Sequence, residues 1–345
     1  MNPTWQSFLQ SRHAVIENGC ITHFGNITTE LKNAQLNTII VDLSHLGLIR
    51  FSGEDALTFL QGQLTCDVKK VDHQTAQYGS YCTPKGRMLA SFLLWQHHHD
   101  YLMQLPLGLC NIIQKRLFLF VLRAKVKLTD SSDSLIRIGI AGNDASKLIE
   151  EILDTKLDSI SQLSSIHNEQ LSIFCHAKNR FELVTTTEKA PALWLELSKY
   201  ANPAGVACWD WLEIRSGFPV ILPATQDQFI PQMTNLDIIG GVSLQKGCYP
   251  GQEIVARTRY LGKIKRRMHL ANIPTTLPVM AGDELFSADM GEQSSGRIVN
   301  AAVSPTGGFD VLAVIQLKSV EAGRIHWKAL DGPKLEIISL PYSLD

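Results

Sequence analysis

The chain has 345 residues, enough for two or three domains of roughly 100–200 residues each. Apolar residues make up 45% of the sequence, and 32 basic residues balance 33 acidic ones to a formal charge of −1. This balance excludes a global field that attracts nucleic acid, so any such binding needs a local patch. Because no secretory signal and no bilayer-spanning apolar run is present, we expect a cytoplasmic protein without membrane contact.

Seven cysteines are spread along the chain without any C-x-x-C pair. An odd count without paired spacing argues against a disulfide scaffold, a zinc site and an iron–sulfur site of the short-spacing kind. We therefore expect no metal site, and we expect six of the cysteines to pack as small apolar side chains. The adjacent residues His97, His98 and His99 could not all face one metal ion from a strand, because alternate side chains point to opposite faces. We therefore expect them at an exposed loop tip between two strands.

The first part of the chain alternates between strand-like and helix-like patterns. We predict that two of the strands pair across the histidine loop and that Ser52 caps the first helix. The predicted strands are 46–51, 90–95, 101–105 and 125–129, and the predicted helices are 54–66 and 111–121.

A polar linker at residues 130–134 opens a second unit. The order strand, helix, strand, strand, helix over about 70 residues is typical of a small ferredoxin-like α+β unit. The elements predicted in that order are 135–141, 144–153, 171–176, 180–185 and 191–200.

The last part begins with a predicted helix over 208–216, which Gly217 ends. From Met268 onward, short apolar runs separated by glycine and proline predict a small β-barrel or sandwich without helices. These runs are 268–273, 282–286, 296–299, 311–315, 324–327 and 335–338. We therefore expect three regions, namely 1–130 together with 201–265, then 131–200, and finally 266–345.

The most unusual stretch leads to a single cysteine, Cys248. Four glycines and one proline within residues 240–251 permit backbone shapes that other residues resist. Pro250 suits the first turn of a helix that continues through 254–256, with Glu253 in that turn. Cys248 would then lie just ahead of a helix N-terminus and two residues from Lys246, and both features favour a thiolate. A buried cysteine that packs in a tight turn is the alternative.

A basic segment follows the motif, with six basic residues and no acidic one between positions 257 and 267. One interpretation is an anion site for an RNA backbone or for the glutamate tail of a folate. The other is a solvated face whose side-chain stems cover apolar surface. The six residues are Arg257, Arg259, Lys263, Lys265, Arg266 and Arg267.

Two tryptophans, Trp209 and Trp211, share one predicted helix with Glu213 and Arg215. Trp209 could stack on a planar ring ligand, but core packing is the commoner role of such residues.

The run Lys246-Gly-Cys-Tyr-Pro-Gly-Gln-Glu253 resembles the signature K-G-C-Y-x-G-Q-E of the YgfZ family, relatives of the glycine-cleavage aminomethyltransferase, or T-protein. Further family landmarks follow in the family's order, and the resemblance covers about residues 40–345, most weakly between 130 and 200. The runs that resemble these landmarks start at Gly53, Phe59, Lys85, Gly217, Phe229, Gly240 and Pro341.

The resemblance implies an α+β fold, a three-domain T-protein-like ring with a ferredoxin-like unit and a C-terminal small β-barrel. Tetrahydrofolate would bind in the central opening, held by the region of 1–130 with 201–265. The family is associated with maintaining iron–sulfur enzymes, including those that methylthiolate tRNA, so such enzymes are the implied partners and tRNA a possible weak contact.

The resemblance also implies roles for single residues. Cys248 matches the cysteine thought to matter most in the family. Trp209 matches one of two folate-holding tryptophans, whereas Leu46 stands where the second would be. The other positions that the resemblance assigns to folate binding are Lys246, Tyr249, Gln252 and Glu253.

One departure from the aminomethyltransferases concerns their chemistry. Those enzymes carry paired aspartates after a glycine pair on a strand, whereas the matching residues here, 86–91, include no carboxylate. Since acid–base catalysis needs a titratable group within hydrogen-bond reach, we hypothesise that methylene transfer from an aminomethyl carrier is absent. The leading hypothesis is therefore an accessory folate-binding protein, with Cys248 acting as a thiol on a cluster, a persulfide or a folate adduct.

Two other hypotheses stay open. A folate-dependent one-carbon transferase with an unknown acceptor would need Asp42, Asp67 or Glu253 as its carboxylate. A tRNA-binding module would use the basic residues from Arg257 to Arg267, although the near-zero net charge makes this the weakest of the three.

Overall fold

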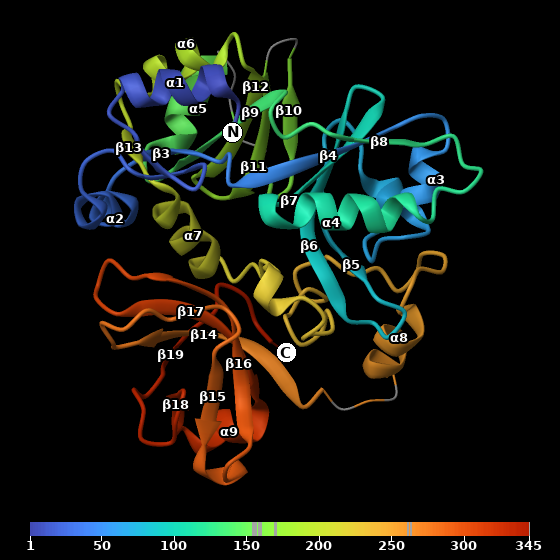
Figure 1. Ribbon diagram of the computed structural model, residues 1–345, viewed down its shortest axis with the longest axis vertical. Helices are drawn as coiled ribbons and strands as arrows, with labels where there is room; N and C mark the ends of the chain where they lie inside the picture. The colour runs from blue at the N-terminus through green and yellow to red at the C-terminus, as the bar shows by residue number, and fades with distance from the viewer. Residues whose placement is uncertain (154–156, 158–160, 169–170, 261, 263, 345) are drawn as a thin grey trace.

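A computed structural model describes the chain except for residues 154–156, 158–160, 169–170, 261, 263 and 345. Three large β-sheets lie around one central helix, α7 (Val206–Arg215), and form three lobes (Figure 1). A small hairpin of β1 (Val15–Glu17) and β2 (Cys20–His23) packs beside this helix. The expected mixed α and β architecture is therefore confirmed.

The first sheet has the order β5-β6-β7-β4-β8 and is antiparallel throughout. The helices α3 (Ala56–Gln61) and α4 (Leu107–Phe118) cover one of its faces. Its other face packs on the second sheet, where the rings of Trp95 and Phe174 are 4.9 Å apart. The strands are β4 (Leu46–Ser52), β5 (Gln77–Cys82), β6 (Met88–His97), β7 (Asp100–Pro106) and β8 (Lys127–Asp130).

The second sheet has the order β10-β11-β12-β9-β3-β13, in which β13 runs parallel to β3 and the other pairs are antiparallel. The predicted strands of residues 131–200 therefore share a sheet with two strands from outside that range. Three helices, α1 (Pro3–Ser11), α5 (Ala145–Leu153) and α6 (Ala190–Leu197), cover one face. The strands are β3 (Ile39–Asp42), β9 (Leu135–Ala141), β10 (Ser165–His167), β11 (Leu171–Ala177), β12 (Arg180–Thr186) and β13 (Asn202–Ala204).

The third sheet confirms the expected C-terminal barrel as a strongly curled sheet, with the order β18-β15-β16-β17-β14-β19. Its two edges come together, because Trp327 N–H donates to the Pro333 carbonyl and Leu335 N–H to that of Ile325, both at 2.9 Å. A short helix, α9 (Leu317–Ala322), lies where we expected none. The strands are β14 (Arg266–Ile273), β15 (Glu284–Ser287), β16 (Ser294–Val303), β17 (Phe309–Gln316), β18 (Ile325–Trp327) and β19 (Glu336–Ile338).

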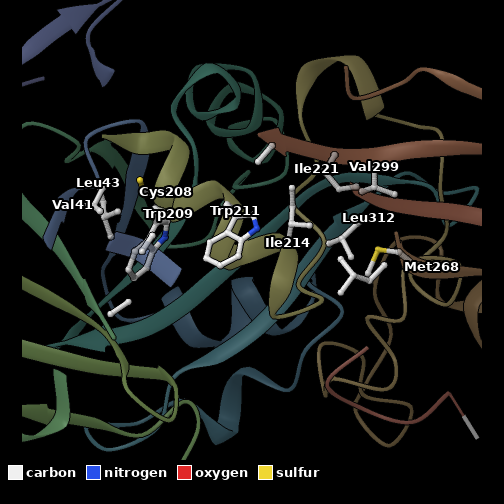
Figure 2. Packing of buried hydrophobic residues seen from close by; sticks show 14 of the residues in the cluster. Val41, Leu43, Cys208, Trp209, Trp211, Ile214, Ile221, Met268, Val299 and Leu312 are labelled. Carbon is white, nitrogen blue, oxygen red and sulfur yellow. The ribbon is translucent and has the colours of Figure 1, made fainter. Parts of the chain in front are cut away.

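Helix α7 joins the second and third sheets through one apolar cluster (Figure 2). Trp209 lies near Val41 at the second sheet, while Ile214 lies toward Val299 and Leu312 of the third sheet. The helix α2 (Ile27–Leu36) packs beside it. Because α7 contributes buried side chains to the packing of both sheets, this helix has a fixed position between the lobes.

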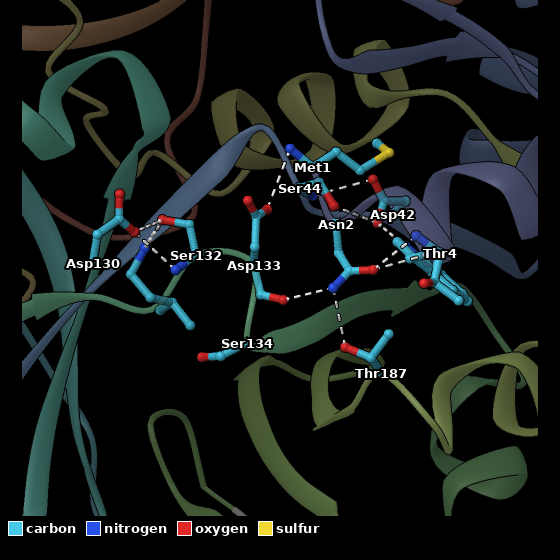
Figure 3. A network of polar contacts seen from close by, with 12 residues as sticks. Met1, Asn2, Thr4, Asp42, Ser44, Asp130, Ser132, Asp133, Ser134 and Thr187 are labelled. Atoms are coloured by element: carbon cyan, nitrogen blue, oxygen red, sulfur yellow. Dashed lines mark hydrogen bonds and ion pairs between the residues drawn. The ribbon is translucent and has the colours of Figure 1, made fainter.

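A polar network holds the N-terminal segment against the second sheet (Figure 3). The Oδ1 of Asn2 accepts hydrogen bonds from the backbone of Thr4 and Trp5, which caps α1. The indole of Trp5 donates to Asp42 Oδ1 at 2.7 Å, and burial raises the pKa of this carboxyl group. Asp42 therefore has a structural role beneath α1.

Most predicted elements are present, and the clearest error is the helix predicted over 54–66. The helix α3 ends at Gln61, because the chain turns at Gly62 and Thr65 N–H then donates to the Ser80 carbonyl of β5 at 3.0 Å. Ser52 belongs to β4 and Asp55 precedes the helix, so the predicted cap is wrong. Leu60 and Leu64 are four positions apart, which is helical spacing, but Leu64 lies in the turn after the helix.

The histidine loop lies at the tip of the β6–β7 hairpin, as predicted, with His97 paired to Asp100. All seven cysteines are free, but Cys20 is only half-buried and Cys248 is exposed, so the prediction of six buried cysteines is wrong for Cys20. Within the described part of the chain, no helix combines the length and apolar character needed to cross a membrane. The described His, Cys, Asp and Glu side chains form no group of three or more suited to a metal ion.

Candidate functional site

A cavity of about 590 Å³ lies where the three sheets meet. Its volume falls within the roughly 300–1,000 Å³ that is usual for small-molecule sites. Its lining comes from α7 and from β2, β4, β5, β6, β7, β11 and β16, together with His45 and loop residues within 218–224 and 279–281. The walls are mostly apolar, and the polar lining residues are Cys20, His45, Tyr78, Ser91, Gln104, His176, Asp210, Glu213 and Asn300.

Helix α7 provides one wall of this cavity. Val206, Trp209, Asp210 and Glu213 all line it, and their spacing of three or four positions puts them on one helix face. The helix starts after Gly205, where a Cβ would lie 1.9 Å from a backbone oxygen of β2. Only glycine allows this approach, which fixes where the lining face begins.

Trp209 is held firmly in the cavity wall. Its side chain is 1% exposed, and the guanidinium carbon of Arg180 lies 5.3 Å from the centroid of the indole. The backbone of Gly139 lies directly against the same ring. Leu46 lines this cavity too, so the structure brings together the two positions that the family resemblance linked to folate stacking.

A chain of buried hydrogen bonds starts at the cavity wall and links the first and second sheets. The Tyr78 hydroxyl lies 3.1 Å from His176 Nδ1, and His176 Nε2 lies 3.0 Å from Glu182 Oε2. The Gln104 amide also donates to this oxygen, at 2.9 Å. Burial raises the pKa of Tyr78, so its hydroxyl stays protonated and available as a donor.

Three polar atoms of lining residues have no hydrogen-bond partner among the described residues, namely Gln104 Oε1, Glu213 Oε2 and His45 Nδ1. The other carboxylate oxygen of Glu213, Oε1, lies 3.5 Å from Arg180 Nη2. Buried polar atoms without partners are costly, and native proteins contain few of them. A ligand that presents N–H donors toward Glu213 and Gln104 would satisfy two of the three.

Asp210 and His45 form a titratable pair on the cavity wall, with Asp210 Oδ1 3.8 Å from His45 Nε2. The Asp210 side chain is 51% exposed, and desolvation by the surrounding cavity walls, helped by the nearby Glu213 carboxylate, raises its pKa to about 7. Desolvation and the charge of Arg137 lower the pKa of His45 to about 3, so this imidazole is neutral near pH 7 and the contact is not an ion pair. A carboxyl group that titrates near neutral pH thus faces the cavity.

The cysteine motif is anchored on a different part of the molecule. The ammonium group of Lys246 donates to the carbonyl oxygens of Leu64 at 2.6 Å and Cys66 at 2.9 Å, and lies 5.2 Å from the centroid of the Tyr249 ring. Desolvation lowers the pKa of Lys246 to about 8. Lys246 therefore connects the cysteine loop to the segment after α3. Its ammonium group donates to backbone carbonyl oxygens.

The motif leaves the thiol of Cys248 exposed between the half-buried Lys246 and the buried Tyr249. Gly251 has a φ of +83°, and a Cβ there would lie 2.5 Å from the Thr83 carbonyl oxygen, so this turn requires glycine. The helix α8 (Gln252–Tyr260) starts only after the turn, so the prediction of Pro250 inside its first turn is wrong. The structure excludes a buried Cys248.

Of the described residues that line the cavity, none comes from 246–253. Gln252 is half-buried and Glu253 is exposed, both at the start of α8. The predicted site residues therefore fall into two groups, one at the cavity and one at the surface around Cys248.

Comparison with known proteins gives this arrangement a context. A family model described as the GCVT N-terminal domain matches residues 17–245, well over half of the chain. The tRNA-modifying protein YgfZ of Colwellia psychrerythraea is 33% identical over 285 residues, which cover 82% of this chain and 87% of that protein. The chain belongs to the YgfZ family. The family's tRNA-modifying protein YgfZ of Sodalis glossinidius is 29% identical over 317 residues, covering 91% of this chain and 96% of that one.

The fold is also that of a solved aminomethyltransferase. The crystal structure of the glycine cleavage system aminomethyltransferase T from Bartonella henselae superposes with a TM-score of 0.80 at 15% identity, covering 99% of this chain and 97% of that one. The resemblance to the YgfZ family and to the T-protein fold is thus confirmed.

The basic segment of this YgfZ-family chain does not form one uniform surface. Arg267 is buried and makes a bidentate ion pair with Asp237, at 2.7 and 3.2 Å. Arg259 also approaches Asp237, at 4.0 Å, but remains exposed. The remaining described members are the exposed Arg257 and Lys265 and the half-buried Arg266, while Lys263 lies outside the described residues.

The carboxylates at the cavity are not those that the transferase hypothesis named. Asp42 lies beneath α1, Asp67 accepts a hydrogen bond from Gln61 at 2.9 Å, and Glu253 is exposed on α8. The carboxylates that do line the cavity are Asp210 and Glu213. Their positions one and four residues after Trp209, on one predicted helix, were the sequence signal that could have identified them.

Proposed function

We propose that this YgfZ-family protein binds tetrahydrofolate in the central cavity and has a role in tRNA modification. The observation that carries the proposal is the unpartnered Glu213 Oε2 and Gln104 Oε1 on an otherwise apolar wall beside Trp209. Relatives named as tRNA-modifying proteins, and a T-protein-like fold, support it.

The chemistry of the cavity fits a folate. A pteridine is a flat ring with an apolar face and with N–H donors and acceptors along its edge. The carboxylate of Glu213 can accept from such donors, and charge-assisted hydrogen bonds of this kind are the stronger ones. Apolar side chains such as Phe92 and Leu93 exclude water from the faces of a flat ligand. When bound, the folate supplies one-carbon chemistry, while the protein orients it.

We further propose that the protein is not a conventional aminomethyltransferase. The strand β6 contributes Ser91 to the cavity wall, and no carboxylate occurs in residues 86–91. The Ser91 hydroxyl accepts a hydrogen bond from Ile221 N–H at 2.9 Å, so it serves the backbone of a neighbouring segment. The strand that carries the acidic pair in the aminomethyltransferases therefore supplies no acid here.

Cys248 completes the proposal as the functional thiol in the maintenance of iron–sulfur enzymes, including those that methylthiolate tRNA. Its exposure and its position outside the cavity support a thiol that meets a macromolecular partner rather than the folate. The cluster or sulfur that it handles would belong to the client enzyme.

The test is complementation of a bacterial strain that lacks its own family member. We expect the wild-type chain to restore 2-methylthio nucleosides in tRNA, measured by mass spectrometry, and Cys248→Ser to fail. Gly247→Ala is the matched control, because a Cβ at this neighbouring position meets no atom within 4 Å. Full restoration by Cys248→Ser would remove the thiol role, and failure of the wild type would remove the function.

A second candidate function rests on Asp210. A carboxyl group with a pKa near 7 in a ligand cavity suits general acid–base chemistry, as a one-carbon transferase would need. Turnover of methylene-tetrahydrofolate with a candidate amine, lost in Asp210→Asn, would support it. Absence of turnover with the wild type across a set of amines would remove it.

A further inference from the structure

An unusually apolar surface segment consists of the last residue of α4, Phe118, and the loop that follows it. The side chains of Phe118, Leu119, Phe120 and Leu122 are 65%, 70%, 50% and 88% exposed. Earlier in the helix the apolar side chains are covered, since Leu109, Ile113 and Leu117 are buried against the first sheet. Contiguous exposed apolar side chains on a folded protein mark a surface that meets another molecule.

The backbone of this loop, residues 118–122, is held in place. Phe120 N–H donates to the Leu117 carbonyl at 3.0 Å, and Ala124 N–H donates to that of Val121 at 2.8 Å. Leu122 has a φ of +47°, a left-handed conformation that branched side chains rarely adopt. The hydrogen bonds therefore define a turn that presents its apolar side chains outward.

The segment that carries the 118–122 loop is basic, and Glu54 and Asp55 of the neighbouring chain meet it at Lys125. Between positions 107 and 129 the chain has five basic residues and no acidic one. Lys125 pairs with Glu54 at 2.7 Å, whereas in the described part of the chain no salt bridge engages the other four. These four are the exposed Lys115, Arg116, Arg123 and Lys127. The chemically complementary partner is therefore anionic and also offers flat apolar surface.

The loop lies on the same side of the molecule as the cysteine motif. Lys125 N–H donates to Asp55 Oδ2 at 2.7 Å, which fixes the end of the loop to the start of α3. The chain after α3 supplies the Leu64 carbonyl that holds Lys246. In Figure 1 the loop after α4, the helix α3 and the helix α8 all lie at the right. The apolar loop and Cys248 are thus linked through α3.

We propose that the 118–122 loop docks an unpaired RNA loop, with bases against Phe118 and Phe120 and phosphates against Lys115, Arg116 and Arg123. This inference rests on the proposed role in tRNA modification and adds the RNA-binding surface to it. Unpaired bases stack on exposed aromatic rings, and cationic side chains neutralise the backbone between them. An anionic membrane would also meet these apolar and cationic side chains, so the choice of RNA rests on the two exposed aromatic rings and on the proposed role in tRNA modification.

The experiment measures the affinity of the full-length protein for a synthetic RNA hairpin with an unpaired loop, by fluorescence anisotropy. We expect the double variant F118S/F120S to weaken binding by about tenfold or more, as loss of base stacking does. The double variant K115E/R116E should weaken binding and flatten its salt dependence. The matched control Leu277→Ser removes a 62% exposed side chain elsewhere and should bind like wild type.

The outcomes separate this inference from the proposed function. Wild-type affinity in F118S/F120S, or no hairpin binding by the wild type, would overturn the RNA surface. Binding to phosphatidylserine vesicles or dimerisation that F118S/F120S abolishes, with RNA affinity unchanged, would also overturn it, in favour of a membrane or a second copy. A titration with tetrahydrofolate on the same variants tests the folate cavity separately, and we expect it to be unchanged in all of them.

Discussion

Gly139 and Trp209 touch so closely that a Cβ at position 139 would lie 2.4 Å from Cζ3 of the indole. The first prediction follows from this contact. Gly139→Ala forces the ring or the strand to move, and overpacking of this kind typically costs about 1–3 kcal/mol. Denaturant unfolding measures the loss, with Gly25→Ala as control because a Cβ there meets no atom within 4 Å. Equal stability of the two variants would show that Trp209 is loosely held.

The second prediction concerns the order in which thiols react. Cys248 is exposed, Cys20 is half-buried at the cavity, and the other five cysteines are buried. Native protein treated with a maleimide should therefore be labelled first at Cys248 and then at Cys20, as peptide mass spectrometry would show. Tetrahydrofolate should slow the labelling of Cys20 and leave that of Cys248 unchanged. Protection of Cys248 instead would place the motif at the ligand.

The third prediction is a pH dependence of stability. Desolvation, together with the Glu213 carboxylate, raises the pKa of Asp210 from the ordinary 3.8 of an aspartate to about 7 in the folded protein. Between these two values the folded state binds more protons than the unfolded state, so stability from this group is lost as pH rises toward 7. The stability of Asp210→Asn relative to wild type should therefore rise between pH 5 and pH 8. A difference that does not change with pH would contradict the assignment.

The fourth prediction tests the anchor of the cysteine loop. Lys246→Met leaves the carbonyls of Leu64 and Cys66 without the ammonium that bonds them. Unpaired acceptors of this kind cost about 1–3 kcal/mol. Chemical denaturation should show this loss, whereas the exposed control Lys199→Met should unfold like wild type. An unchanged unfolding free energy would mean that water replaces the ammonium at no cost.

Much of the architecture could be predicted from sequence, because its elements have clear periods. The strand over Leu135–Ala141 has the predicted bounds, and the six C-terminal runs all form strands of one sheet. The helix predicted over 54–66 failed because apolar spacing alone cannot separate a helix from a helix followed by a turn into a sheet. Pairing of β3 and β13 with β9–β12 involves contacts distant in sequence, which no local pattern encodes.

The site was predictable in part. The octapeptide drew attention to Cys248, whose thiol is exposed, and the two positions that the resemblance assigned to folate, Trp209 and Leu46, line one cavity. The cavity carboxylates were missed because Asp210 and Glu213 acquire their environment from three sheets that meet only in the folded chain. The buried ion pair of Arg267 with Asp237 could not be predicted either, because the partner lies outside the basic segment in sequence.

Calorimetric titration with tetrahydrofolate tests the central claim most directly. We predict saturable binding by wild type, binding weaker by about tenfold or more in Glu213→Gln, where a charge-assisted hydrogen bond is lost, and none in Ala301→Trp, which fills the cavity. Unfolding curves check that both variants fold. The surface control Glu196→Gln, on α6, should bind like wild type. No heat with the wild type, or equal affinity in all four proteins, would contradict a folate site in this cavity.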